Sequence, residues 1–457
     1  MTGYERALRP QVAGDVFIRG DTDYDRLRRG WDLSINQFPA LILVPRNVAD
    51  VAAGVRFAAD AGWGVGVQST GHGTLYPADD QLLIVTSRMA AVQVDVEART
   101  ARVEAGASWR QVLDAITPFG LAALLGSSPD VGVVGYMLGG GIGWLGRCHG
   151  FGADSLRRVD IVTADGLLRH ASSRENSDLF WGLRGGGGNF GVVTAMEFDL
   201  YPLATVYGGN LIYPGELARD ALRFYREWLA KLPDELSSWM AISKFPPLPQ
   251  VREAFRGKTL ALLVGAFAGT AAEGQRWIQP WLDWHAPIDN TFRELPFSEI
   301  GTISTDPVAP TAMHGSSDML DELSDAAIDV IVEHALDPRS PLSLHVVRHA
   351  GGAIARVPAE VSAVGNRDAQ LYFFTAGPAA TPEAAAVLPR EVQRYRAALQ
   401  PHVRGGMWLN FMNGNGAGAR ARIKEAYGTE AQQRLLALKA KYDPNNTFRF
   451  SFQLGGP

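Results

Sequence analysis

The placement of the glycines limits most strongly what this chain can fold into. Of 50 glycines in 457 residues, 21 lie in three stretches: five in 62–73, ten in 126–152 and six in 182–191. Glycine tolerates positive φ and lets the backbone approach a ligand closely. Successive backbone N–H groups in such loops form nests that suit a pyrophosphate. Three runs in one half of the chain therefore predict a large phosphorylated cofactor rather than three unrelated tight turns.

Composition excludes several classes of protein. The formal net charge of −5 provides no basic surface for nucleic acid. No apolar stretch reaches the ~20 residues that cross a bilayer, and no signal-peptide core follows the N-terminus. The only cysteine, Cys148, can form neither an internal disulfide nor a zinc site alone. We therefore expect a cytoplasmic globular protein without nucleic-acid, membrane or metal partners, and we leave its oligomeric state open.

The chain divides near residue 203. The first 33 residues are charged and irregular, and we expect them to wrap the surface. Residues 40–73 are predicted to form strand, helix, strand and loop, with Asn47 as the helix N-cap and a polar loop at 69–73. That loop lies at the carboxyl end of a strand, where α/β sheets often bind ligands. After Pro202 glycine thins out, and helices and strands alternate.

The usual nucleotide-binding fingerprints do not fit. The run Gly139-x-Gly141-x-x-Trp144 lacks the third glycine of a dinucleotide motif. The Walker-like tripeptide at 257–259 lacks its leading glycine, because Arg252 stands there. The cofactor is therefore expected to be held by neither a Rossmann nor a P-loop mechanism.

Six motifs supply a resemblance that composition could not. They lie, in family order, at 68–73, 131–144, 162–166, 178–194, 408–411 and 441–448. Together they resemble the flavoprotein oxidases of the vanillyl-alcohol-oxidase/PCMH fold, in the berberine-bridge-enzyme-like branch. The resemblance covers most of 38–203 and 405–453, whereas 204–404 matches only in general character.

The resemblance implies an α+β fold. It comprises a PCMH-type FAD-binding domain of two α/β subdomains (1–203, core 38–203) and a substrate domain with an antiparallel sheet backed by helices (204–404). A berberine-like C-terminal segment (405–457) returns to the FAD domain. The flavin ring is expected between the domains.

The resemblance also implies how FAD is attached. The histidine that matches His72 bonds to the flavin 8α-methyl group in the family. Many relatives add a cysteinyl bond, but Ser128 occupies that position here, and a serine hydroxyl is too weak a nucleophile for it. We therefore expect FAD attached through one histidine. The other residues implied to bind FAD are Gln68, Ser69, Thr70, Gly71, Gly73, Ser127, Ser128, Val131, Gly132, Gly135, Gly139, Gly140, Gly141, Gly143, Trp144, Gly191, Val192, Val193 and Asn446.

The residues around the implied flavin depart from the family pattern. Trp408 and Phe411 replace both tyrosines of the C-terminal Tyr-x-Asn-Tyr motif, and Ile142 replaces a third tyrosine. None of these side chains can accept a proton. Either the substrate needs no strong base, or the substrate domain supplies one, or the flavin carries out oxygenation or rearrangement.

Among candidate bases we favour Tyr372 over His345 and His349, which share one face of a predicted strand. Asn410 is expected to form a hydrogen bond inside the pocket. Val131 occupies the family position that gates oxygen, where valine accompanies oxidases.

The expected function is therefore that of an FAD-dependent oxidase. It would transfer hydride from a small organic substrate (an alcohol, amine or activated C–H, expected to be a secondary metabolite) to flavin, and O2 would reoxidise the flavin to give H2O2. The alternatives are a flavin-dependent oxygenase or oxidative cyclase, and a binding protein that kept the fold without turnover.

Overall fold

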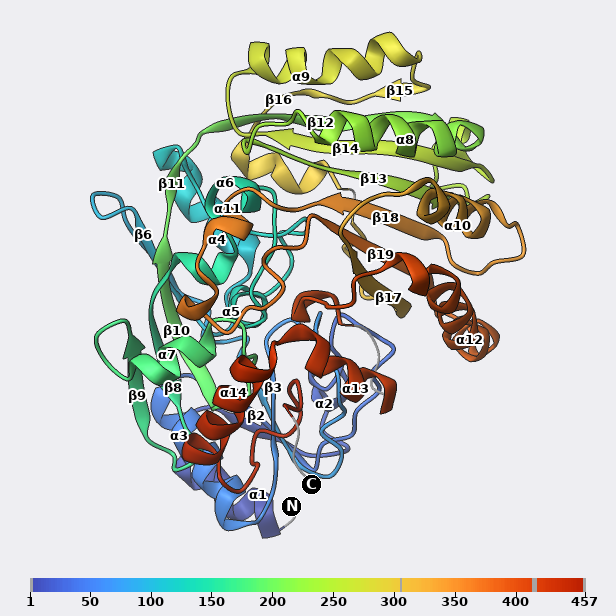
Figure 1. The fold of residues 1–457 in the computed structure, drawn as a ribbon. Helices are drawn as coiled ribbons and strands as arrows, with labels where there is room; N and C mark the ends of the chain where they lie inside the picture. The colour runs from blue at the N-terminus through green and yellow to red at the C-terminus, as the bar shows by residue number, and fades with distance from the viewer. Residues whose placement is uncertain (1–2, 305, 413–416, 455–457) are drawn as a thin grey trace.

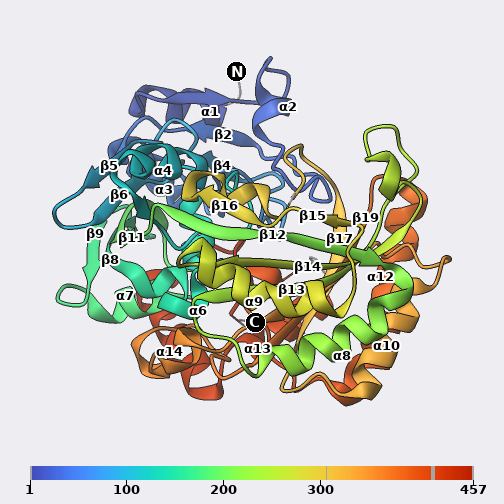
Figure 2. The same cartoon turned by 90° about the horizontal axis from the view of Figure 1, so that it is seen from above.

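Three large β-sheets form the frame of the protein (Figures 1 and 2). The computed structural model describes residues 3–304, 306–412 and 417–454. No helix among these residues combines the length and the apolar character that crossing a bilayer requires.

The N-terminal part of the chain builds the first sheet, in the order β1-β2-β4-β3. Strands β2, β4 and β3 are parallel, and β1 is antiparallel to β2. Asn47 accepts a hydrogen bond from the Asp50 N–H and caps α3, as expected. The elements are α1 (Gly3–Leu8), β1 (Asp15–Phe17), α2 (Tyr24–Leu27), β2 (Leu41–Val44), α3 (Val48–Asp60), β3 (Val65–Gln68) and β4 (Leu82–Val85).

The expectation that residues 1–33 only wrap the surface is wrong. Strand β1 is hydrogen-bonded into the first sheet, and Leu8 and Val16 are buried in its core. Apolar residues are too sparse in this segment to show a period in the sequence, yet several of them are buried.

The second sheet is antiparallel, in the order β5-β6-β10-β8-β9. Ser108 and Gln111 form the capping box of α4. The elements of this part are β5 (Val92–Asp95), β6 (Thr100–Glu104), α4 (Trp109–Ile116), β7 (Leu121–Ala122), α5 (Val133–Leu138), α6 (Gly146–His149), β8 (Leu156–Val162), β9 (Leu168–Ser172), α7 (Ser177–Leu183), β10 (Val192–Asp199) and β11 (Tyr201–Pro202).

The third sheet has eight antiparallel strands, in the order β15-β12-β14-β13-β18-β19-β17, with β16 beside β12. Helices α8, α9, α10 and α12 bury one apolar cluster against one face of it. The other face looks toward the first half of the chain (Figure 1). The elements are β12 (Thr205–Pro214), α8 (Ala218–Leu229), β13 (Leu236–Lys244), β14 (Thr259–Phe267), α9 (Ala271–Trp284), β15 (Asp289–Asn290), β16 (Arg293–Pro296), β17 (Met313–Leu320), α10 (Asp325–Leu336), β18 (Leu344–His349), α11 (Ala353–Arg356), β19 (Leu371–Pro378) and α12 (Pro382–Leu399).

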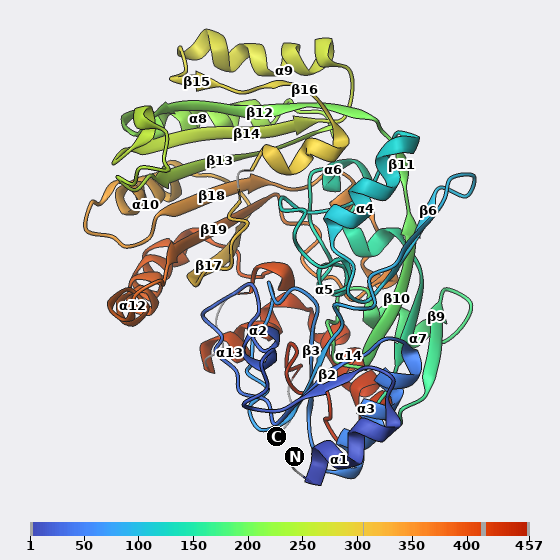
Figure 3. The same ribbon diagram turned by 180° about the vertical axis from the view of Figure 1, so that it is seen from behind.

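The end of the chain returns to the first half. Helix α14 (Thr429–Tyr442) packs against α7 in the first half of the chain, whereas Arg422 of α13 (Ala417–Ala426) donates hydrogen bonds to β17 of the third sheet (Figure 3). The Thr447 carbonyl accepts a hydrogen bond of 2.8 Å from the N–H of Val65, at the start of β3. The Tyr427 hydroxyl donates to the Gly185 carbonyl at 2.8 Å.

Candidate cofactor and active site

His72 lies in the loop that follows β3, with its imidazole fixed on two sides. Its Nδ1 lies 2.9 Å from the Thr70 hydroxyl, and its ring stacks on Trp31 with centroids 4.5 Å apart and planes 12° from parallel. Burial lowers the pKa of His72 to about 4, although the charge of Asp130 opposes the shift. The imidazole is therefore neutral at pH 7. Its Nε2 is buried without a hydrogen-bond partner in the described structure.

The loops at 68–73 and 127–135 meet beside His72. The Thr70 hydroxyl accepts a hydrogen bond of 3.2 Å from the Gly132 N–H. A Cβ at Gly132 would lie 2.9 Å from the Ser69 hydroxyl, which is buried and has no hydrogen-bond partner among the described residues. A Cβ at Gly73 or at Gly135 would meet no atom within 4 Å.

This surface fits the cofactor that the resemblance implies. Two buried polar atoms without partners, Ser69 Oγ and His72 Nε2, stand beside open space at two glycines. Buried polar groups are nearly always hydrogen-bonded, so these atoms indicate a ligand. Residues 69–73 and 132–135 would hold the FAD.

Trp31 is the residue of this site that sequence reasoning missed. Its N–H donates to the Thr70 carbonyl at 2.9 Å, and its Nε1 donates to the Val308 carbonyl at 3.1 Å. Gly71 has φ +76°, and a Cβ there would collide with Gly30, so the two segments touch backbone to backbone. The sequence feature that could have indicated a role for Trp31 is its position next to Gly30 at the end of a charged segment.

Gln68 has a different role from the one expected. Its Nε2 donates to the carbonyls of Leu27 and Arg29 at 3.1 and 3.2 Å, and its Oε1 accepts from Gln37 at 2.9 Å. The side-chain amide is therefore committed to the N-terminal segment and is not free to bind a cofactor.

The glycine run at 139–143 is fixed by Asn410. The Asn410 Oδ1 accepts from the Gly141 N–H at 2.7 Å, and its Nδ2 donates to the Tyr136 carbonyl at 3.0 Å. Gly140 and Gly141 have φ of +107° and +78°, which favour glycine. Since both ends of its amide serve the backbone, Asn410 positions this loop, and the catalytic role expected for it finds no support.

The rest of this region packs against the chain itself. A Cβ at Gly143 would collide with the Leu125 carbonyl, and one at Gly139 would lie 2.8 Å from Asn410. The Trp144 ring stacks on Trp239 of β13 at 4.2 Å, so it joins this loop to the third sheet.

The third glycine run packs closely against other parts of the chain. Glycines 185–188 approach Val364 and the C-terminal segment, and a Cβ at Gly191 would collide with the Val162 carbonyl. Val192 and Val193 are buried in β10, where they pair with β8 and not with β6. Their side chains are covered, so the contact with FAD expected of Gly191, Val192 and Val193 would be made by backbone groups, and it stays a prediction.

Asn446 lies in the C-terminal segment, and the contact with FAD expected of it stays a prediction. It is exposed, has φ +53° and forms a turn just before Thr447, which binds the start of β3. The His72 loop follows the other end of β3. A positive φ favours asparagine after glycine, so the turn explains this residue.

The 127–131 segment lies between the two halves of the protein. The Ser127 carbonyl accepts from Ser304 at 3.1 Å, and the Ser128 hydroxyl accepts from the Asp130 N–H at 3.3 Å. Val131 is partly buried, and its carbonyl accepts from the Trp109 N–H at 3.0 Å.

Tyr372 stands on the sheet face that looks toward these loops. Its ring lies 4.5 Å from Phe411 and 5.5 Å from Trp408, and its hydroxyl is buried without a geometric hydrogen bond among the described residues. Burial raises the pKa of Tyr372 well above its ordinary value. It therefore stays protonated at neutral pH, which opposes a role as base and leaves it able to donate a hydrogen bond.

The two candidate histidines are held elsewhere. His345 lies 3.1 Å from the Thr375 hydroxyl and packs edge-on against Tyr395, on the helix-covered face. The Nε2 of His349 lies 2.9 Å from Arg147, and burial together with that charge lowers the pKa of His349 to about 3.

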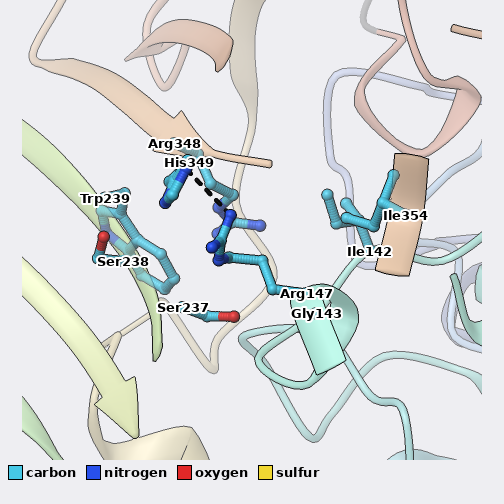
Figure 4. Close-up of a pocket in the computed structure, with 9 residues that line it drawn as sticks. All are labelled: Ile142, Gly143, Arg147, Ser237, Ser238, Trp239, Arg348, His349 and Ile354. Carbon is cyan, nitrogen blue, oxygen red and sulfur yellow. Dashed lines mark hydrogen bonds between the residues drawn. The ribbon is translucent and has the colours of Figure 1, made fainter. Parts of the chain in front are cut away.

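A small cavity lies where the third sheet meets the loop at 142–147 (Figure 4). It encloses about 10 Å³, space for a single water, so it is not the substrate pocket itself. The residues that line it are Ile142, Gly143, Arg147, Ser237, Ser238, Trp239, Arg348, His349 and Ile354.

Comparison with known proteins agrees with this geometry. The sequence profile of the FAD binding domain matches residues 39–172, and that of the berberine and berberine-like family matches 409–452. The (R)-6-hydroxynicotine oxidase of Paenarthrobacter nicotinovorans is 27% identical over 97% of this chain and 97% of its own. This chain is an FAD-linked oxidoreductase. The glucooligosaccharide oxidase of Sarocladium strictum is 27% identical to the oxidoreductase, over 92% of this chain and 89% of its own.

Solved structures confirm the α+β fold of the FAD-linked oxidoreductase. The 6-hydroxy-D-nicotine oxidase from Arthrobacter nicotinovorans superposes with a TM-score of 0.85 at 23% identity, over 97% of this chain and 98% of that one. A chitooligosaccharide oxidase superposes with a TM-score of 0.87 at 24% identity, over 99% and 100%. The fold expected from the sequence is therefore confirmed, and the two sequence profiles confirm the family resemblance.

Proposed function

We propose that this FAD-linked oxidoreductase is an oxidase that carries FAD covalently on His72 and acts on a small, largely apolar substrate. The observation that carries the proposal is the neutral, clamped imidazole of His72, whose Nε2 is buried without a partner in the described chain. Bound FAD would accept a hydride from the substrate and pass its electrons to O2, giving H2O2. Val131, at the position that gates oxygen in the family, agrees with O2 as the acceptor.

A single covalent link is part of this proposal. A glucooligosaccharide oxidase from Acremonium strictum holds a 6-S-cysteinyl, 8α-N1-histidyl FAD. In this chain Ser128 takes the cysteine position. Burial raises the pKa of Cys148 to about 12, and its Sγ donates to the Asp234 carbonyl at 3.2 Å. A thiol with that pKa is not a nucleophile at neutral pH.

The apolar surroundings favour a substrate that needs no strong base. Trp239 and Tyr372 lie on the sheet face next to the loop that Asn410 holds, and Phe411 packs against Tyr372 from outside the sheet. Among the relatives, one is named for an amine substrate and others for oligosaccharides. Aromatic side chains and a protonated tyrosine suit an amine or an activated C–H better than a sugar hydroxyl, whose proton must be removed.

The test begins with colour. The purified protein should show a flavin absorption band, and acid precipitation should leave the flavin in the pellet. Amines and benzylic substrates should bleach the flavin without oxygen, and H2O2 should appear when air is admitted. A colourless protein would refute the oxidase, and a yellow supernatant would refute covalent attachment.

Covalent attachment should be insensitive to pH across the neutral range. An ordinary histidine becomes protonated as the pH falls through about 6.5. The pKa of His72 is lowered to about 4, so its imidazole remains an unprotonated nucleophile from pH 8 down to pH 5. Apoprotein mixed with FAD should therefore give the same covalent yield at pH 5.5 and 7.5. A yield that falls with a midpoint near pH 6.5 would contradict the lowered pKa.

Trp31 should speed attachment without being needed for FAD binding. A stacked aromatic pair contributes about 0.5–1.5 kcal/mol, so Trp31→Ala should slow covalent coupling about two- to tenfold. Trp31→Phe retains a stacking ring and should couple nearly as fast as the parent. Trp63→Ala, which removes a tryptophan from a cluster with Tyr4 and Phe57, is the matched control. Equal coupling rates in all three variants would show that Trp31 does not contribute to flavin attachment.

A further inference from the structure

A cation stands on the sheet face that looks toward the cofactor loops. Strand register pairs Arg348 of β18 with Trp239 of β13 on one side and with Tyr372 of β19 on the other. Tyr372 is paired in turn with Met319 of β17. Directly paired residues share a face of the sheet, so these four side chains form one row.

The surroundings of Arg348 are aromatic. Its guanidinium carbon lies 4.2 Å from the ring centre of Trp239 and 5.6 Å from that of Phe411. Trp239 stacks on Trp144, and Phe411 lies 4.5 Å from Tyr372. Aromatic faces attract a cation, but they accept few of the five N–H groups that a guanidinium offers.

The charge of Arg348 has no counter-ion in the described chain. Among the described residues, no carboxylate lies within ion-pair distance of the Arg348 guanidinium, and no oxygen accepts a hydrogen bond from it. Asp306 attracts the guanidinium only from farther away. Burial lowers the pKa of Arg348. The buried Arg367 is different, because it holds Asp154 with two hydrogen bonds of 2.6 and 2.9 Å. Arg348 is half-buried, and a guanidinium held among aromatic rings without such a partner is open to an anion supplied from outside the chain.

Arg348 also lies next to the loop that adjoins the implied flavin. It lines the small cavity together with Trp239 from the sheet and with Ile142 and Gly143 from the loop (Figure 4). Gly143 is two residues from Gly141, which Asn410 fixes. The unpaired cation is thus at the junction between the substrate sheet and the cofactor domain.

We propose that Arg348 is a specificity-determining residue that binds the anionic group of an aromatic substrate, a carboxylate. The planar guanidinium can hold a carboxylate through two parallel hydrogen bonds. The ring of the substrate would then lie against Phe411, which is only partly buried and whose ring centre is 5.6 Å from the guanidinium carbon. This inference rests on the proposed oxidase function and narrows it to aromatic acids. The other possible source of negative charge is the reduced flavin itself, and the experiment separates the two.

The experiment is calorimetric titration of the holoprotein with benzoate and with benzamide, which has the same shape without the charge. The parent should bind benzoate about 10- to 100-fold more tightly than benzamide, because hydrogen bonds to a charged group contribute about 1.5–3 kcal/mol. Arg348→Met should remove that preference and leave benzamide binding unchanged. Arg348→Lys, which keeps the charge but not the paired donors, should retain an intermediate preference. Arg339→Met removes an exposed arginine and should behave like the parent.

The outcomes are separable. Equal affinity of the parent for both probes overturns the inference, as does benzoate binding that survives Arg348→Met. A potentiometric titration of the flavin covers the other source: if Arg348→Met lowers the flavin midpoint potential and leaves benzoate affinity intact, the flavin is the anion and the inference is wrong. If Arg348→Met does not fold, the test rests on Arg348→Lys, whose preference for benzoate over benzamide should be weaker than that of the parent; an unchanged preference would overturn the inference. A colourless protein refutes the oxidase, whereas a yellow protein that ignores benzoate refutes only the role of Arg348.

Discussion

Substitution of His72 by alanine should abolish the covalent flavin completely. Acid-precipitated His72→Ala should give a colourless pellet and a yellow supernatant, and its band on a denaturing gel should lose flavin fluorescence. The physical reason is that neither of the other two candidate attachment residues is a nucleophile at neutral pH. Ser128 carries a hydroxyl, which is too weak a nucleophile. Burial raises the pKa of the Cys148 thiol to about 12, so this thiol is not ionised at neutral pH.

The matched control is Ser128→Ala, which should keep the full covalent yield. The Ser128 hydroxyl only accepts a hydrogen bond from the Asp130 N–H at 3.3 Å. Flavin retained in the acid pellet of His72→Ala, or lost from that of Ser128→Ala, would show that the attachment site has been misassigned.

Replacing Asn410 by leucine should give the second large effect, on stability and on cofactor content together. The change leaves the Gly141 N–H and the Tyr136 carbonyl without their partners. An unsatisfied buried polar group costs about 1–3 kcal/mol, so the two together should lower the free energy of unfolding by about 2–6 kcal/mol. Thermal unfolding and the flavin-to-protein absorbance ratio measure the two effects.

Asn445→Leu serves as the comparison, because Asn445 is exposed in a turn. It should change the unfolding temperature little and the flavin ratio not at all. If Asn410→Leu keeps both parental stability and full flavin content but loses turnover, then Asn410 acts on the substrate and does not merely position the loop.

The polar loop at 69–73 could be predicted from the sequence because its signal is local. Residues 69–73 follow one strand directly, and His72 lies within that loop. Trp31 could not be predicted, since its stacking on His72 depends on a long-range contact with Val308. Only the folded chain brings these three residues together.

The glycine runs show a different limit. A glycine is required wherever a backbone must be approached closely, whether the neighbour is a ligand or another part of the chain. Gly73 and Gly135 border open space, whereas Gly187 and Gly188 are covered by the C-terminal segment. In the sequence, glycines that face a ligand cannot be distinguished from glycines that pack against the chain itself. Likewise, the sequence predicted a hydrogen bond from Asn410 inside the pocket, whereas its two hydrogen bonds to the backbone of Gly141 and Tyr136 follow only from the structure.

The surroundings of the His72 loop include contacts with residues that are synthesised much later, which sets the earliest time at which the proposed cofactor site can form during synthesis. The hydrogen bond from Trp31 to Val308 joins residues 277 positions apart. The N–H of Val65 cannot form its hydrogen bond until Thr447 has been synthesised. At ~5–20 residues per second, a ribosome needs about 14–55 s to proceed from Trp31 to its partner. The His72 loop thus emerges early but acquires its final neighbours last. Flavin attachment should therefore follow release of the finished chain, and ribosome-bound fragments that stop before Thr447 should remain unlabelled.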